Sequence, residues 1–133
     1  MKKVEKDLDD AWSKLVKLRA GNCCEYCGNT KSLNSHHIFS RGKKSTRWDV
    51  NNGICLCVAH HIGSGFSAHK TPLPFARWLI EKRGESWYDL LNYRSNQTYK
   101  AHDFEKEILL NELRKEIKQY ENNKIQSIKR RYV

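Results

Sequence analysis

Apolar residues recur at helical spacing in the first part of the chain. Between residues 5 and 19 they stand three and four positions apart, at Leu8, Ala11, Trp12, Leu15 and Leu18. This period predicts an amphipathic helix with one buried face. Aspartates come early in the segment and basic residues come late, which suits the helix dipole. Gly21 and Asn22 are expected to end the helix.

The next segment, from residue 22 to about residue 70, has no helical period until near His60. It is rich in Gly, Ser, Asn, Cys and His. Clusters of such residues are typical of turns and short strands rather than of long helices. We therefore expect a knuckle turn, a short β-hairpin and a following helix.

Helical periodicity returns after the break at residues 71–74. It predicts a helix that ends before Gly84, a second short helix that begins near Ser86, and a long helix over residues 103–120. The aromatic residues of this part recur at helical spacing, which favours core positions over base-stacking positions. The apolar stripe of the long helix must be buried against the domain or against a second copy, and the sequence leaves both open.

The size of the chain limits its organisation. A length of 133 residues allows one domain with a modest core. The prediction is a single α+β domain over residues 1–133, with an N-terminal helix (5–19), a core (22–70) and a helical extension with a basic tail (74–133). Only 38% of the residues are hydrophobic, so we expect a structural metal or a partner to help stabilise the fold.

The charge balance points to a polyanionic partner. The chain has 25 Lys and Arg against 15 Asp and Glu, a net charge of +10. Such an excess favours phosphate contacts, and DNA is the partner we expect. The sequence shows no signal peptide and no apolar stretch of membrane-spanning length, so a cytoplasmic protein with no membrane partner is expected.

The cysteines are predicted to bind metal. An odd number of cysteines, five, in a chain without a secretion signal argues against a disulfide framework. Two pairs have the spacing of zinc ligands: Cys24 with Cys27, and Cys57 with His60. Together they predict a closed Cys₃His site for structural Zn²⁺. Cys23 and Cys55 remain as small buried residues, although Cys23 could compete with Cys24.

Histidines between and beside these pairs are candidates for catalysis. His37 is the candidate general base, because imidazole titrates near neutral pH. His36 would point the opposite way on a strand, either to ligate a second cation or as a structural residue. His61 follows a zinc ligand and is expected to face the groove that holds His37. We predict that His61 ligates a catalytic cation, with His69 in reserve.

Asn52 and several basic residues complete the candidate site. The Asn52 amide could fix the His37 loop or offer its oxygen to the cation. The segment Asn51-Asn52-Gly53 is also typical of a simple turn. Six basic residues and one acid lie between positions 29 and 70. Four of the basic residues are expected to contact phosphates: Arg41, Lys43, Lys44 and Arg47.

The order of these residues resembles a known family. The residues Cys24, Cys27, Ser35-His36-His37-Ile38, Asn52 and Leu56-Cys57-x-x-His60-His61 resemble the zinc-bearing HNH endonucleases. Further similarity, at residues 37–41, 46–52 and 75–85, is to the phage NinG (Rap) branch. Proteins of that branch are linked to recombination and act on branched DNA. This chain has His60 where the family generally has a fourth cysteine, and His36 where the branch tends to have glycine.

The resemblance implies a fold and an activity. It implies a ββα-metal (HNH) core and hydrolysis of DNA phosphodiester bonds with Mg²⁺ or Mn²⁺, leaving 5′-phosphate and 3′-hydroxyl ends. It also implies the host cytoplasm as location if a phage encodes the chain. One such site cuts one strand, and a homodimer could cut two. The alternatives are a non-catalytic zinc module that binds nucleic acid, a nuclease acting on RNA, and an interaction scaffold that uses the 103–120 helix.

Overall fold

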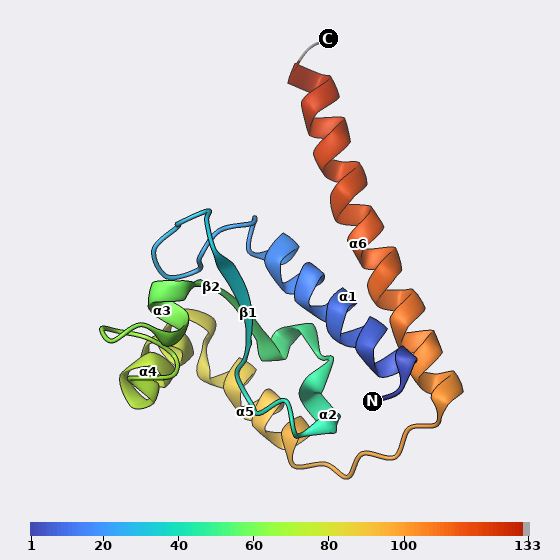
Figure 1. The fold of residues 1–133 in the computed structure, drawn as a ribbon, viewed down its shortest axis with the longest axis horizontal. Helices are drawn as coiled ribbons and strands as arrows, with labels where there is room; N and C mark the ends of the chain where they lie inside the picture. The colour runs from blue at the N-terminus through green and yellow to red at the C-terminus, as the bar shows by residue number, and fades with distance from the viewer. Residues whose placement is uncertain (132–133) are drawn as a thin grey trace.

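The computed structural model describes residues 1–131 and has an α+β architecture (Figure 1). This confirms the predicted fold class at that level. A two-stranded sheet lies in the middle, with helices on both sides. The elements in chain order are α1 Lys3–Arg19, β1 Leu33–His37, α2 Lys44–Arg47, a 3₁₀ turn at Val50–Asn52, β2 Gly53–Cys57, α3 Val58–Ile62, α4 Pro72–Arg83, α5 Glu85–Ser95 and α6 Asp103–Arg131.

The two strands form an antiparallel hairpin. Their register runs from Leu33 opposite Cys57 to His37 opposite Gly53. Every residue of β2 is buried, whereas β1 is half-buried. Because successive strand residues face opposite sides, His36 and His37 leave β1 in opposite directions.

Each face of the hairpin has its own hydrophobic core. Cys55 of β2 packs with α1, Trp48 and α6, while Ile54 and Leu56 pack with α4 on the other side. Figure 1 shows this separation, with α1 and α6 on one side of the sheet and α3 and α4 on the other. A strand covered on both faces needs apolar residues at consecutive positions, which is why Ile54, Cys55 and Leu56 do not alternate with polar residues.

The apolar face of α1 is buried, as the sequence predicts. Leu8, Trp12 and Leu15 are almost fully buried. They lie in one cluster with Leu110, Leu113 and Ile117 of α6, a set spaced three and four residues apart. The predicted apolar stripe of α6 is therefore buried against this chain at Leu110, Leu113 and Ile117. Phe104 and Ile108, also part of the predicted stripe, are exposed.

Helix α6 extends further than its hydrophobic pattern predicts. The pattern indicates residues 103–120, and the helix continues to Arg131. Residues 121–131 contain no Gly or Pro and are mostly good helix formers, so the backbone continues without burial. Residues 132 and 133 of the predicted extension lie outside the described part of the chain.

Ion pairs of the carboxylates Glu5 and Asp9 connect α1 to the rest of the molecule. The Glu5 carboxylate accepts hydrogen bonds from Lys44 and Lys106, each at 3.0 Å. These two ammonium groups lower the pKa of Glu5 to about 2. Asp9 accepts from Arg47 at 2.7 and 2.9 Å and from the Trp48 indole at 2.8 Å. The polar side of α1 is thus fixed to the segment that follows β1.

No helix within residues 1–131 is both long and apolar enough to cross a membrane.

Gly53 provides a test of how closely α1 packs on the hairpin. A Cβ at this position would overlap the Val16 side chain and lie 2.9 Å from Trp12 Cζ2. We expect Gly53→Ala to lower the free energy of unfolding by about 1–3 kcal/mol, because α1 must shift to admit the methyl group. Urea unfolding followed by circular dichroism measures the change.

Gly42→Ala is the matched control. Its Cβ would meet only Ser40 Oγ, at 3.6 Å. We expect a change within about 0.5 kcal/mol there. Equal stability of the two variants would contradict the close packing of α1 on Gly53.

Candidate metal centres

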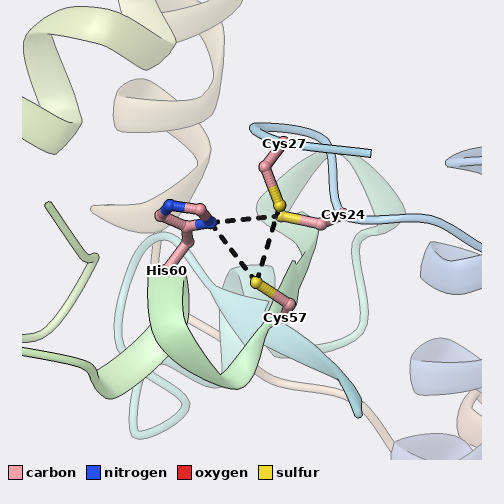
Figure 2. A group of neighbouring side chains, drawn as sticks. All are labelled: Cys24, Cys27, Cys57 and His60. Carbon is pink, nitrogen blue, oxygen red and sulfur yellow. Dashed lines mark hydrogen bonds between the residues drawn. The ribbon is translucent and has the colours of Figure 1, made fainter. Parts of the chain in front are cut away.

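Four side chains converge on one point at the junction of β2 and α3. They are Cys24, Cys27, Cys57 and His60, and their ligand atoms all lie within 4.8 Å of one another (Figure 2). The Sγ atoms of Cys27 and Cys57 are 3.8 Å apart. His60 Nδ1 lies 3.3 Å from Cys57 Sγ and 3.9 Å from Cys24 Sγ. Four ligands around one Zn²⁺ have separations of about 3.5–3.8 Å, so the residues fit the ion.

Local backbone structure brings these ligands together. Cys24 and Cys27 lie on a turn closed by a hydrogen bond from Gly28 N–H to the Cys24 carbonyl, 2.8 Å. Gly28 has φ +79°, a conformation that favours glycine. Cys57 is the last residue of β2, and His60 lies in the first turn of α3. The spacing of each pair thus places both its side chains on one side of a short turn.

The environment of Cys24 favours the thiolate. Burial opposes ionisation, but hydrogen bonds from backbone N–H groups of Cys57, Cys27 and Tyr26 lower the pKa of the Cys24 thiol to about 6. The thiolate is the form that binds metal. The Tyr26 ring also lies against the His60 ring, with centroids 4.5 Å apart, and limits the movement of this ligand.

The two remaining cysteines lie outside this group. Cys23 donates its thiol hydrogen to the Ala20 carbonyl at 3.1 Å. Cys55 is fully buried, and burial raises the pKa of its thiol to about 11. The choice between Cys23 and Cys24 that the sequence left open is therefore resolved in favour of Cys24. The Cys₃His group can hold a metal ion such as zinc, as the spacing predicts.

A second group of possible ligands lies on the face of β1 that carries His36. His36, His61 and His69 come together here, with all their ligand atoms within 4.8 Å. The Nε2 atoms of His61 and His69 are 3.1 Å apart. Two imidazole nitrogens on one ion stand about 3.0–3.4 Å apart, so this pair fits a shared cation. His69, the reserve candidate, belongs to the group together with the two histidines preferred from the sequence.

Burial favours the neutral form of two imidazoles in this group, those of His36 and His61. Burial is the main cause that lowers the pKa of His36 to about 3, and the charges of His61 and His69 add to it. Burial and His69 also lower the pKa of His61. A cation binds the neutral form of imidazole, because this form has a free lone pair.

Asn34 orients His61, a role that the sequence did not predict. His61 Nδ1 lies 3.1 Å from Asn34 Oδ1. An amide oxygen only accepts, so Nδ1 carries the hydrogen and Nε2 keeps its lone pair toward the group. A hydrogen-bonded second nitrogen is the usual arrangement for a metal-binding histidine. The available signal was the strand period, since Asn34 is two residues before His36 on the same face.

His37 occupies the opposite face of β1. Its ring stacks on Trp12 at 3.7 Å between centroids and 7° between planes. Its Nε2–H donates to the Arg47 carbonyl at 2.8 Å, which leaves the lone pair on Nδ1. Burial lowers the pKa of His37. Within residues 1–131 the polar contacts of His61 are with Asn34 and His69 rather than with His37, so the structure does not bring those two candidates into contact.

Asn52 holds the loop that follows His37. The residue is fully buried. Its Oδ1 accepts from Phe39 N–H at 2.7 Å, and its Nδ2 donates to the carbonyls of Phe39 and Thr46, both at 3.0 Å. The sequence left two roles open for Asn52, fixing the loop or binding the cation. The geometry favours fixing the loop, because Asn52 Oδ1 already accepts a backbone N–H.

The four candidate phosphate contacts differ in exposure. Arg47 is buried and paired with Asp9, which is a structural position rather than a surface one. Arg41 shares Asp9 but remains 56% exposed, and Lys44 pairs with Glu5 at 45% exposure. Lys43 is exposed and donates to Asn96 at 3.2 Å. The structure therefore favours Arg41, Lys43 and Lys44 over Arg47 as surface cations.

Comparisons of the chain with protein-family models, with curated proteins and with solved structures found no match. The function is therefore inferred from the residues and the geometry of the two groups.

The Cys₃His group predicts one tightly bound, thiolate-coordinated zinc ion per chain. Removing a thiolate from the group should abolish tight binding, so Cys57→Ser should lose this zinc, whereas Cys23→Ser should keep it because Cys23 lies outside the group. Elemental analysis of the purified chains gives the zinc content. Substitution by Co²⁺ and absorption spectroscopy reports the sulfur ligands. Wild-type protein that holds no transition metal and keeps its circular dichroism spectrum in strong chelator would contradict this prediction.

Proposed function

We propose that this protein is a metal-dependent DNA endonuclease that resembles the HNH (ββα-metal) enzymes. The observation that carries the proposal is the convergence of His36, His61 and His69 beside a Cys₃His group in a basic chain. A structural zinc group has no need of three further imidazoles close to the hairpin, on β1, on α3 and in the turn before α4. Metal-bound imidazoles next to a base are the groups that phosphodiester hydrolysis uses.

His36, His61 and His69 would bind the catalytic cation. When bound, such a cation stabilises negative charge on the phosphate and on the leaving oxygen. Asn34 keeps the His61 ring turned so that its lone pair faces the group. Three nitrogen ligands suit transition metals better than Mg²⁺, which prefers oxygen ligands, so of the two expected cations we propose Mn²⁺ as the more effective.

His37 would act as the general base. The hydrogen bond from Nε2 to the Arg47 carbonyl leaves Nδ1 to accept a proton from water, and the Trp12 ring fixes the plane of the imidazole. Asn52 supports this arrangement by holding the loop after His37. His37 is the last residue of β1, so a phosphodiester group that crosses this end of the strand would lie between the His37 side and the His36 side.

The partner that this proposal requires is the phosphate backbone of DNA. The exposed cations at Arg41, Lys43 and Lys44 lie on the segment that follows His37, at the end of the hairpin where the phosphodiester group would cross. Backbone contacts of this kind give weak sequence preference and steep salt dependence. A branched recombination intermediate is the substrate that the likeness to the NinG branch favours.

Removing the His37 imidazole is the direct test of the base. We expect His37→Ala to reduce nicking of supercoiled plasmid by about 10²–10⁴-fold, the usual contribution of a positioned base, while DNA binding is retained. Gel analysis of plasmid with added Mn²⁺ measures the rate. His102→Ala is the control, because His102 is exposed and its ring stacks on Phe104, away from the three-histidine group and from His37.

Three outcomes of this assay would change the proposal. Wild-type protein that binds DNA without cutting it would favour a non-catalytic zinc module. Full activity of His37→Ala would remove the assigned base. Cleavage of RNA in preference to DNA, in a parallel assay, would change the substrate.

Asn34 gives a second test, independent of cleavage. Loss of its acceptor frees the His61 ring to rotate, so we expect Asn34→Ala to weaken Mn²⁺ binding by about 10–100-fold. Titration followed by electron paramagnetic resonance, on protein that retains its zinc, measures free Mn²⁺ directly. Asn111→Ala, an exposed position on α6, should bind Mn²⁺ as wild type does. Equal affinity of both variants would argue against a cation at the three histidines.

A further inference from the structure

The distal part of α6 projects away from the rest of the molecule. The last buried residue of the helix is Ile117, and residues 118–131 are all exposed. An ion pair between Lys14 and Glu121, 2.9 Å, marks the end of its contact with α1. Figure 1 shows the helix continuing well past the end of α1. At 1.5 Å per residue, residues 122–131 extend over about 15 Å.

This projecting segment, residues 122–131, is strongly basic. Its charged residues are Lys124, Lys129, Arg130 and Arg131, and it contains no acid. Its charge is therefore +4 over ten residues. Duplex DNA carries one negative charge per about 1.7 Å of its axis, so a segment of this length and charge is complementary to several phosphates.

A second copy of the chain fits this segment poorly. Its apolar residues are Ile125 and Ile128, each about half exposed. Two isoleucines per chain fall far short of the roughly 1,200–2,000 Å² that a stable interface buries. Pairing of two copies through this segment would also bring two charges of +4 together.

We propose that residues 122–131 of α6 form a DNA-binding arm that contacts the phosphate backbone outside the cleaved site. The inference rests on the proposed function for the identity of the polyanion, and it adds a second contact that the histidine groups do not supply. Because the arm belongs to α6, whereas the histidines lie on β1, on α3 and in the turn before α4, it contributes affinity and not chemistry. The cations around His37 then position the scissile phosphate, and the arm lengthens the bound stretch of DNA.

The test neutralises the arm and measures duplex binding as a function of salt. The variant K124Q/K129Q/R130Q/R131Q keeps the helix, since glutamine is a good helix former. Binding is measured with no added Mn²⁺ or Mg²⁺ and no chelator. Each lost phosphate contact reduces the magnitude of the slope of log K against log salt by about 0.9, so we expect a total reduction of about 3 to 4. At low salt the affinity should drop about tenfold or more. In the plasmid assay with added Mn²⁺, the cleavage rate at saturating enzyme should stay unchanged.

The control removes four positive charges elsewhere. It is K3Q/K31Q/R77Q/K100Q, at exposed positions outside the arm and outside both histidine faces. A control variant that loses as much affinity and slope as the arm variant would overturn the proposal, because net charge would then explain the effect.

The remaining outcomes separate the arm from the proposed function. Wild-type protein that binds no duplex at any salt concentration would overturn the proposed function and the arm together. Strong binding with the same slope for wild type and arm variant would overturn the arm alone. Sedimentation velocity should give the same mass for wild type and for I125Q/I128Q. A dimer lost in I125Q/I128Q would assign the segment to self-association instead.

Discussion

The Cys₃His group is the constraint on which the candidate site depends. It brings the turn before β1 to the junction of β2 and α3, two segments that are separated in sequence. Together with the hydrophobic cores on the two faces of the hairpin, a metal bound here would hold the two strands in register. The same junction fixes the direction of α3, because His60 is a ligand and His61 is the next residue. A metal at the first group would therefore also set where the second group forms.

Strand geometry divides the chemistry between two faces. Neighbouring residues on β1 must point in opposite directions, so His36 meets His61 and His69 while His37 meets Trp12. Each face has its own support: Asn34 acts behind His61, and Asn52 acts behind the loop after His37. Asn34 engages an imidazole ring that would otherwise rotate, whereas Asn52 engages backbone groups and so fixes the loop.

Helix α1 has a more specific role than its amphipathic pattern suggests. Its apolar face packs on β2 and α6, and its polar side carries the buried carboxylate of Glu5 and the partly buried carboxylate of Asp9. Asp9 holds Arg47, and the Arg47 carbonyl in turn accepts from His37. Removing one partner of such a buried pair costs more than the pair contributes, because an unpaired charge remains inside. The orientation of the His37 ring is therefore linked to the position of α1.

The sequence by itself determined the local features of this protein: the helix at α1, the pairing of Cys24 with Cys27 and of Cys57 with His60, and the opposed directions of His36 and His37. All of these depend on spacings of a few residues, which backbone geometry converts directly into side-chain positions. Only the tertiary structure decided that His69 joins His36 and His61, that Asn34 orients His61, that Arg47 is buried against Asp9, and that α6 packs on α1 as far as Ile117. These are contacts between distant segments, and no local period records which segments will meet.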